Sequence, residues 1–321
     1  MNRRRLLAVV CVFVSGVTGW GVWSPVTADE ERLPTPHPVF QKQVLSARAD
    51  LVVVHALVED DGNPVAGLTE KNFEVYEDNA RQPLSLFGSQ DEPVTAGILI
   101  DNSSSMAPNR DRVIAAGLHF ARMSNPRDEL FVLHFNDHVA FGLPPNTAFT
   151  GQLVTLQQAL LRMTGLGKTA LYDAISSGLD HLKTGTQQTR VLILVSDGGD
   201  NASRRTLREV LDRVRRTDVL IFSVAVIDQY NRDAKPAVLK ELANATGGQV
   251  WRPRHVDDVH AAFDEIARDI RSGYSLGFVS TNQEQNGAYR KIRVVARDAR
   301  GRKLSVRARA GYIASSGDGG L

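Results

Sequence analysis

The distribution of apolar and polar residues divides the chain into a central region and two flanks. Between residues 94 and 272, short apolar runs alternate with segments in which apolar residues recur every three or four positions. This alternation is typical of buried parallel strands connected by amphipathic helices. We expect strands at 96–100, 129–135, 138–142, 191–195, 219–226 and 249–252, and helices at 110–123, 150–163, 170–183, 204–216, 234–246 and 256–271.

The two flanks carry strand patterns without helices between them. Asp61-Gly62 and Asn286-Gly287 are hairpin turn signals. The front flank has too little apolar surface to fold comfortably alone, so we expect the rear flank to complete it. The predicted strands of the flanks cover residues 51–58, 73–77, 84–87, 274–280, 289–297 and 303–308.

Together these patterns predict an α/β fold. The central region is expected to form a doubly wound, Rossmann-like, mostly parallel six-stranded sheet. Its strand at 138–142 follows a turn too short for a crossover and should therefore be an antiparallel edge. This region is inserted in a small antiparallel β-domain built from both flanks. The predicted divisions are a signal peptide or N-terminal anchor (1–28), a Pro-rich linker (29–43), the first half of the β-domain (44–92), the α/β domain (93–272), the second half of the β-domain (273–314) and a flexible tail (315–321).

The first 28 residues have the features of an export signal. Arginines occupy positions 3–5, residues 6–14 are strongly apolar, and residues 26–28 are small enough for a signal peptidase. The apolar stretch can extend to Trp23, which is near spanning length, so an uncleaved anchor is the alternative. The only cysteine, Cys11, lies here, so a cleaved chain has no disulfide. We expect a periplasmic or extracellular protein, which contacts the membrane only if this segment is an uncleaved anchor.

Composition and charge exclude few classes. The chain of 321 residues is 42% hydrophobic and 23% charged, which is ordinary for a globular protein. The formal net charge is +2 and becomes −1 without the three arginines at positions 3–5. Because no basic excess remains, we do not expect a nucleic-acid partner.

Oxygen-bearing side chains follow predicted elements at one edge of the sheet. Asp101, Ser103 and Ser105 follow the first apolar strand, Asp197 follows a second one, and Thr169 opens a helix. In open α/β sheets, ligands bind beyond the carboxyl ends of strands where the strand order reverses. Hydroxyl and carboxylate oxygens suit a small hard cation such as Mg²⁺ or Mn²⁺, which takes about six oxygen ligands.

Each of these motifs has a simpler interpretation when it is taken alone. Thr169 is expected to cap its helix, and Asp197-Gly198 is expected to form only a turn. Their joint placement after two strongly apolar strands and at one helix start favours a shared metal site.

These motifs resemble the metal-ion-dependent adhesion site of von Willebrand factor type A domains. The resemblance covers about residues 93–272. Some flanking segments, at 72–79 and 273–312, resemble those of a bacterial subgroup of the family. The motifs themselves are Asp-Asn-Ser-Ser-Ser at 101–105, Gly-Lys-Thr-Ala-Leu-Tyr-Asp at 167–173 and Leu-Val-Ser-Asp-Gly-Gly-Asp-Asn at 194–201.

The resemblance implies a role for each residue of the site. Ser103, Ser105 and Thr169 would bind the metal directly, whereas Asp101 and Asp197 would act largely through water. The last coordination position would be taken by an acidic residue, Asp or Glu, of a protein partner. Because the direct ligands are mostly neutral hydroxyls, the cation stays electrophilic and attracts such a carboxylate.

The function expected from the sequence is non-enzymatic, metal-dependent protein binding, because no nucleophile–base pair accompanies the ligand set. Residues 167–169 (Gly-Lys-Thr) resemble the end of a P-loop, but the required earlier glycine is replaced by Arg162. His255 and His260 are expected to be solvated or capping residues. A metal-dependent hydrolase and a structural envelope scaffold with a vestigial metal site are the alternatives left open.

Overall fold

A computed structural model of the chain describes residues 51–89, 92–162, 166–227, 233–255 and 258–316. These described residues belong to one compact unit. The predicted leader and linker, and residues 317–321 of the predicted tail, lie outside the described residues, so their assignments stay predictions. None of the described helices is long and apolar enough to cross a membrane.

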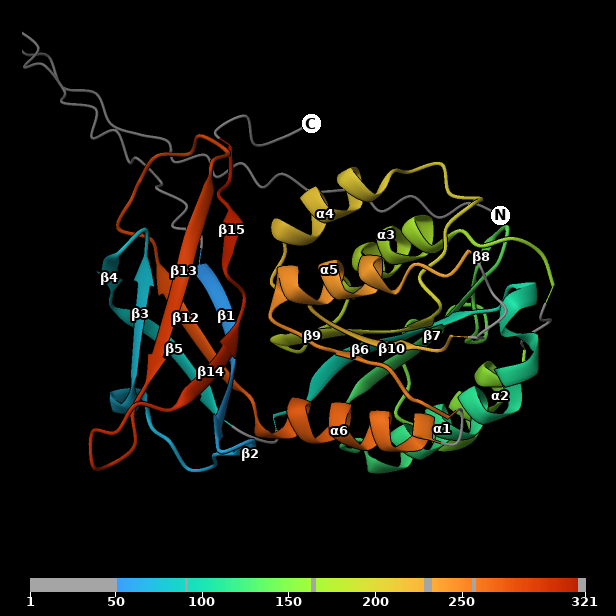
Figure 1. Cartoon of the computed structure of the whole chain (residues 1–321), viewed down its shortest axis with the longest axis horizontal. Coiled ribbons are helices and arrows are strands. Elements are labelled where there is room, and N and C mark those ends of the chain that lie inside the picture. Colours follow the sequence, from blue (N-terminus) through green and yellow to red (C-terminus); the bar gives the residue numbers. More distant parts are fainter. Residues whose placement is uncertain (1–50, 90–91, 163–165, 228–232, 256–257, 317–321) are drawn as a thin grey trace, which may run out of the picture. The chain divides into compact units, whose positions relative to one another are not determined.

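The central region forms a six-stranded sheet with the order β11-β10-β9-β6-β7-β8 (Figure 1). All neighbouring strands are parallel except β7 and β8, so the mostly parallel sheet with one antiparallel edge strand is confirmed. The order reverses at β6, since the chain continues to β7 on one side and later returns to β9 on the other. The strands are β6 (Val94–Asp101), β7 (Glu129–Phe135), β8 (Val139–Phe141), β9 (Thr189–Ser196), β10 (Leu220–Ala225) and β11 (Val250–Trp251).

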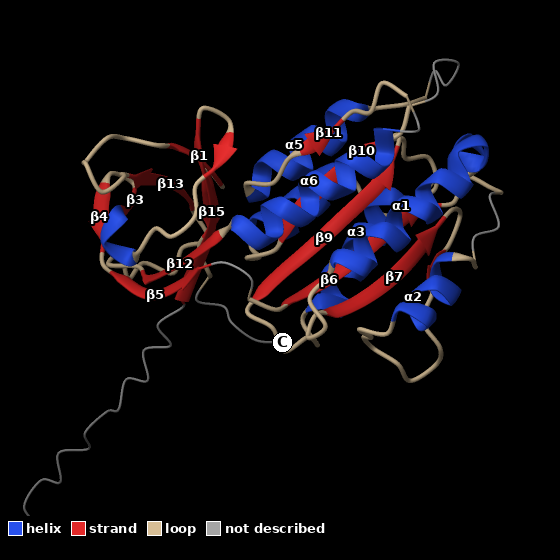
Figure 2. Ribbon diagram, turned by 90° about the horizontal axis from the view of Figure 1, so that it is seen from below, coloured by secondary structure: helices blue, strands red, loops and turns tan. Residues whose placement is uncertain are grey.

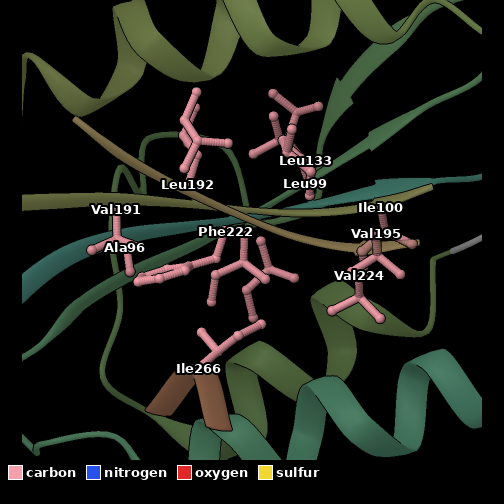
Figure 3. Close-up of a cluster of buried hydrophobic side chains, with 14 of the residues drawn as sticks. Ala96, Leu99, Ile100, Leu133, Val191, Leu192, Val195, Phe222, Val224 and Ile266 are labelled. Carbon is pink, nitrogen blue, oxygen red and sulfur yellow. The ribbon is translucent and has the colours of Figure 1, made fainter. Parts of the chain in front are cut away.

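Helices cover both faces of this sheet (Figures 1 and 2). Helices α3, α4 and α5 lie on one face, and α1 and α6 lie on the other, with α2 packed beside α1. Figure 3 shows Leu99 and Leu192 pointing to one face of the sheet, while Phe222 points to the opposite face, toward Ile266 of α6. Burial on both faces explains the unbroken apolar runs. The helices are α1 (Arg110–Met123), α2 (Leu153–Leu160), α3 (Leu171–Leu182), α4 (Leu207–Arg215), α5 (Pro236–Thr246) and α6 (Val259–Ser272).

The two flanks combine into a β-domain with two antiparallel sheets, ordered β14-β1-β12-β5 and β15-β13-β3-β4, with β2 paired to β1 (Figure 2). Strand β1 precedes the inserted region and pairs with β12 and β14, which follow it, so the predicted insertion is confirmed. Both sheets contribute to one core that includes Val54, Phe73, Tyr274 and Ile292. The strands are β1 (Leu51–Asp60), β2 (Asn63–Pro64), β3 (Phe73–Glu77), β4 (Ala80–Gln82), β5 (Leu84–Ser89), β12 (Tyr274–Val279), β13 (Tyr289–Ala296), β14 (Ser305–Ala308) and β15 (Gly311–Ile313).

A few elements differ from the sequence pattern. Helix α2 begins at Leu153 rather than at residue 150, because Thr150 forms an antiparallel bridge with Leu130. A 3₁₀ helix, Ser104–Asn109, separates β6 from α1 and was not expected. Strands β2, β4 and β15 contain two or three residues each, too few to show an alternation in the sequence.

Two arginines near the carboxyl end of the β-domain connect it to the α/β domain. Arg309 donates from Nη1 to the Thr217 carbonyl (2.5 Å) and from Nη2 to the Arg215 carbonyl (2.8 Å). Arg307 forms an ion pair with Asp269 of α6 (2.7 Å). Because Thr217 lies just before β10, these contacts are made near the amino end of the six-stranded sheet.

Candidate metal centre

The loop after β6 is organised by a buried carboxylate. Asp101 has no exposed surface. Its Oδ1 accepts a hydrogen bond from the backbone N–H of Ser103 (3.0 Å), and its Oδ2 accepts one from the Ser196 hydroxyl (2.6 Å). The first of these bonds closes a tight turn at the end of the strand. The Oγ atoms of Ser103 and Ser105 then lie 3.1 Å apart.

The loop after β9 supplies the second carboxylate. The Ser105 hydroxyl donates to Asp197 Oδ2 (2.8 Å), and the Gly199 N–H donates to Asp197 Oδ1 (2.8 Å). Gly198 has a φ of +83°, and a Cβ at this position would lie 2.4 Å from the Lys235 carbonyl oxygen. This turn therefore requires glycine, and it fixes the direction of the Asp197 side chain.

The loop before α3 carries Thr169 to the same edge. Its Gly167 exchanges two hydrogen bonds with Ser104: the Gly167 N–H donates to Ser104 Oγ (3.1 Å), and the Gly167 carbonyl accepts from the Ser104 N–H (3.2 Å). The Thr169 N–H donates to Asn201 Oδ1 (2.8 Å), and the Thr169 carbonyl accepts from the N–H groups of Asn201 and Ala202 (both 3.0 Å). This loop is therefore tied to both of the others.

The simpler interpretation of Thr169 as a helix cap is wrong. The N-cap of α3 is Ala170, and the first-turn N–H groups of this helix bond instead to Asp200 Oδ2 and Ser203 Oγ, both at 3.0 Å. Within the described part of the chain, the Thr169 side chain has no hydrogen-bond partner, and the residue lines a pocket. Its hydroxyl is therefore available to a ligand.

The structure brings all five predicted site residues together at the carboxyl end of the sheet. Ser103, Ser105, Thr169 and Asp197 line an open pocket of about 320 Å³, and Asp101 lies behind its wall. Oxygen ligands at 2.0–2.1 Å from Mg²⁺ are about 3.0 Å apart along the edge of an octahedron. The 3.1 Å separation between the Oγ atoms of Ser103 and Ser105, the two neighbouring residues expected to bind directly, fits this spacing.

The composition of this pocket is unusual for a metal site. No three His, Cys, Asp or Glu side chains are arranged to hold a metal ion anywhere in the described ranges. The candidate centre is not such a group, because three of its five residues contribute hydroxyls and only two contribute carboxylates. Such donors suit hard cations such as Mg²⁺ and Mn²⁺ better than soft ones. The residues therefore fit the expected cation, although their role as ligands stays a prediction.

Burial changes the acidity of Asp101. Loss of hydration raises the pKa of this carboxyl to about 6, and the negative charge of Asp197 acts in the same direction. Hydrogen bonds from Ser103 and Ser196 oppose the increase. A cation in the pocket favours the ionised form of both carboxylates.

Sequence analysis assigned no role to several residues that hold the three loops. The Ser196 hydroxyl connects Asp101 to the backbone N–H of Gly198 (3.0 Å). Asp200 and Ser203 accept hydrogen bonds from backbone N–H groups in the first turn of α3. All of them lie in one stretch, 196–203, rich in Asp, Asn and Ser. That density directly after a buried strand is the signal that could have identified them, because these side chains commonly bond to loop backbone.

His255 and His260 lie away from this pocket, and so do the arginines of α4. The His260 ring packs against the His119 ring with 5.7 Å between centroids, and the backbone N–H of His255 donates to Asp258 Oδ2 (3.2 Å). Arginines on and beside α4 form ion pairs at the surface, such as Arg213 with Asp180 (2.6 Å).

Comparison with known proteins identifies the family of the central region. A model of the von Willebrand factor type A domain matches residues 97–268. Similar solved structures include a von Willebrand factor type A protein from Catenulispora acidiphila, with 14% identity and a TM-score of 0.49, covering 77% of this chain and 74% of that chain. Another is the vWF domain of the type V pili tip protein Mfa5 from Porphyromonas gingivalis, with 13% identity and a TM-score of 0.43, covering 57% and 96%. No curated protein matches. Because the family model spans more than half of the sequence, the chain belongs to the von Willebrand factor type A domain family.

Proposed function

We propose that this protein is an exported, metal-dependent protein-binding module. Ser103, Ser105 and Thr169 would hold Mg²⁺ or Mn²⁺ directly, and Asp101 and Asp197 would contribute largely through water. A partner protein would complete the site with an Asp or Glu side chain. The observation that carries this proposal is the convergence of three loops on one open pocket, where the hydroxyls of Ser103 and Ser105 lie 3.1 Å apart and Ser105 donates to the Asp197 carboxylate.

The charge around the pocket supports an acidic partner. The direct donors would be neutral hydroxyls, so little of the cation's charge would be neutralised by the protein itself. Lys168 and Lys235 also line the pocket, are exposed, and form no ion pair within the described ranges. Both features favour an incoming carboxylate over a neutral group.

The lining of the pocket supports binding rather than catalysis. No histidine, cysteine or tyrosine contributes to it among the described residues. Its carboxylates are Asp197 of the proposed site, Asp233, and Asp200, which already accepts hydrogen bonds from the start of α3 and from Ser203. A metal-dependent hydrolase needs a group that moves a proton, and we therefore propose that the site captures a partner without turning it over.

Calorimetric titration of MgCl₂ and MnCl₂ into the chain without its predicted signal peptide (residues 29–321, called the exported chain below) tests the metal site. Wild type is expected to give saturable heat, and Thr169→Ala is expected to weaken metal binding about tenfold or more. Ser177→Ala is the matched control, because its hydroxyl bonds only within helix α3, to the Asp173 carbonyl. Equal affinities for wild type and Thr169→Ala would contradict the proposed ligand set.

Partner capture is tested separately with the immobilised chain and an extract of the cell envelope. Binding is expected in Mg²⁺, with loss in chelator and in Thr169→Ala, and competition by free acidic peptides. Capture that survives both chelator and the variant would instead support the scaffold alternative. Chelator-sensitive phosphatase or esterase turnover would support the hydrolase.

A further inference from the structure

A second and larger cleft, of about 740 Å³, lies near the opposite end of the six-stranded sheet. It is formed by strands of the β-domain together with α3, the end of α4, Arg190 of β9 and residues 217–219, which precede β10. Strand β9 connects the two sites, because Arg190 near its start lines this cleft and Ser196 at its end supports the metal loops. The volume is within the range of about 300–1,000 Å³ that small-molecule sites occupy.

The lining of this cleft is strongly basic. Among the described residues, its acidic side chains are only Asp218 and Glu284. Its basic side chains are Lys183, Arg190, Arg215, Arg216, Arg290 and Arg309.

Four of these bases are partly neutralised by carboxylates, and two are not. Lys183 pairs with Asp180, Arg190 with Asp218, Arg216 with Asp212, and Arg290 with Glu77. Arg215 and Arg309 form no ion pair within the part of the chain that the structure describes. Basic side chains of the cleft therefore outnumber the carboxylates that pair with them, although the charge of Asp218 also attracts Arg309.

Arg309 is the most unusual of these groups, because it is only 5% exposed. Its Nε, Nη1 and Nη2 atoms donate to the carbonyls of Gly311, Thr217 and Arg215, so the guanidinium is held in one position. Carbonyl oxygens satisfy hydrogen bonds but do not neutralise a full charge, and two of the five N–H groups of a guanidinium remain for a ligand. Burial lowers the pKa of Arg309 to about 10, which still leaves it charged near pH 7.

Arg190 adds a second unused donor. Its Nη1 bonds to Asp218 (3.3 Å), but its Nε is buried and has no partner among the described residues. Buried donors without partners are rare in proteins and cost free energy unless a ligand or water satisfies them.

The uncharged part of the lining is mixed: it includes polar side chains such as Ser280, Asn282 and Gln283 as well as an apolar portion. Leu51, Val53, Val279 and Ile313 contribute to its wall from the β-domain, and Leu179 and Leu182 contribute from α3. Leu51 is 46% exposed, which is high for a leucine at the start of a strand that is otherwise mostly buried. A site that combines fixed cations with an apolar wall is complementary to a molecule with one anionic end and one apolar end.

We propose that this cleft binds a small amphiphilic anion. The carboxylate or phosphate head contacts Arg190, Arg215 and Arg309, and the apolar body packs against Leu51, Val53 and Ile313. This site is separate from the metal centre and needs no divalent cation.

Calorimetric titration of the exported chain with decanoate and with decyl phosphate tests this proposal and distinguishes the two head groups. At least one of them is expected to bind with a saturable heat that chelator does not change. Decyltrimethylammonium, which has the same tail and the opposite charge, is expected to bind at least tenfold more weakly. Inorganic phosphate, which has no tail, is expected to bind at least tenfold more weakly than decyl phosphate.

Two variants keep the test independent of folding. Arg215→Gln is expected to weaken binding of the anionic probe about tenfold, and Leu51→Ser about threefold. Arg208→Gln on the same helix removes an exposed arginine that does not line the cleft, and it should leave affinity unchanged. Absence of saturable binding for both anions, equal binding of the cationic probe, or equal losses in Arg215→Gln and Arg208→Gln would overturn the proposal. These results do not depend on whether the metal centre binds Mg²⁺.

Discussion

Each end of the six-stranded sheet has a buried ionisable side chain that connects separate segments of the chain, Asp101 at one end and Arg309 at the other, and the two charges have different surroundings. At the carboxyl end, Asp101 accepts hydrogen bonds from two loops, and burial raises the pKa of its carboxyl to about 6. At the amino end, Arg309 donates to three carbonyls, and burial lowers the pKa of its guanidinium to about 10. In both places, burying the charge costs free energy. The role of each charge depends on the groups to which its side chain is hydrogen-bonded.

The difference lies in which segments each charge connects. Asp101 bonds to Ser103 and Ser196, which belong to loops at the edge of a pocket, so its charge contributes to that pocket. Arg309, between β14 and β15, joins the β-domain to the last residue of α4 and to Thr217 beyond it, so its loss disturbs the contact between two domains. We therefore expect loss of Arg309 at the amino end mainly to lower stability, and substitutions at the carboxyl end mainly to weaken metal binding.

The largest effect is expected for Arg309→Met. Three backbone carbonyls lose their donor, and an unsatisfied buried acceptor typically costs about 1–3 kcal/mol, so the free energy of unfolding should fall by about 4 kcal/mol. Urea unfolding measures this change, and Arg208→Met serves as the exposed control, with an expected change within about 0.5 kcal/mol. A folded Arg309→Met chain that also lost Mg²⁺ affinity would break the distinction between the two ends.

The next effect concerns pH and His55, which is buried near the amino end. Burial lowers the pKa of His55 to about 4, with Asp218 opposing and Arg309 adding to the decrease. Between about pH 4 and the ordinary value near 6.5, the unfolded chain binds a proton that the folded chain excludes, so stability falls as the solution is acidified. This contribution amounts to about 3 kcal/mol between pH 7 and pH 4.

His55→Asn removes this titration and should weaken the acid-dependent loss of stability. Urea unfolding of wild type and variant at several pH values measures the difference. If both chains lost the same stability between pH 7 and pH 4, His55 would not be the group responsible.

A smaller effect is expected for Asp101→Asn at the carboxyl end. The amide keeps an acceptor for the Ser103 N–H but removes the charge, so metal affinity should fall between about 10- and 100-fold, or about 2 kcal/mol. Without metal, the variant should be at least as stable as wild type near pH 7, because a buried charge has been removed.

Calorimetry and urea unfolding in chelator measure these two quantities for Asp101→Asn. The raised pKa of Asp101 makes the folded wild type bind the extra proton, so its stability falls as pH rises from about 4 to 6. The variant lacks this trend, which is opposite in sign to that of His55. If Asp101→Asn were less stable than wild type but bound metal equally well, Asp101 would contribute to stability and not to metal binding, contrary to our expectation.

The smallest effect is expected for Ser104→Ala. Its hydroxyl bonds to the N–H and carbonyl of Gly167, which join the first loop to the Thr169 loop, while Ser104 itself is exposed. Stability should fall by about 1 kcal/mol, and metal affinity should fall by about threefold because one loop is held less firmly. Thermal unfolding with and without Mg²⁺ measures both quantities. A loss of metal affinity as large as that of Asp101→Asn would contradict a role for Ser104 that is limited to holding the loops together.

The carboxyl end was largely predictable from sequence, and the amino end was not. Strands β6 and β9 show as unbroken apolar runs because both their faces are covered, and the oxygen-bearing residues follow them directly. Asp101 and Asp197 could thus be placed at one edge by local pattern and by resemblance to a known family. Their mutual contacts through Ser105 and Ser196 follow from the parallel pairing of neighbouring strands.

The contacts of Arg309 have no local signal. Its carbonyl partners at Thr217 and Arg215 lie 92 and 94 positions earlier in the chain, and a backbone acceptor has no residue identity. The same limit explains why sequence analysis did not find the large cleft, whose wall combines Leu51, Arg190 and Ile313 from three distant segments. The predicted pairing of the two flanks indicated only that the segments containing Leu51 and Ile313 would lie in one domain.

The way in which the α/β domain is inserted affects how the protein resists mechanical tension. The chain leaves the β-domain after β5 and returns at β12, where Ser89 and Tyr274 pair side by side. Force applied between the proposed partner at the metal loops and the chain ahead of Leu51 therefore passes through two covalent connections, one after β5 and one before β12. Both connections lie at the same end of the sheet that contains β1, β12 and β5. Leu51 pairs with Val279 at the other end, so the force loads the ladder between β1 and β12 in shear, and its hydrogen bonds must break together rather than one by one.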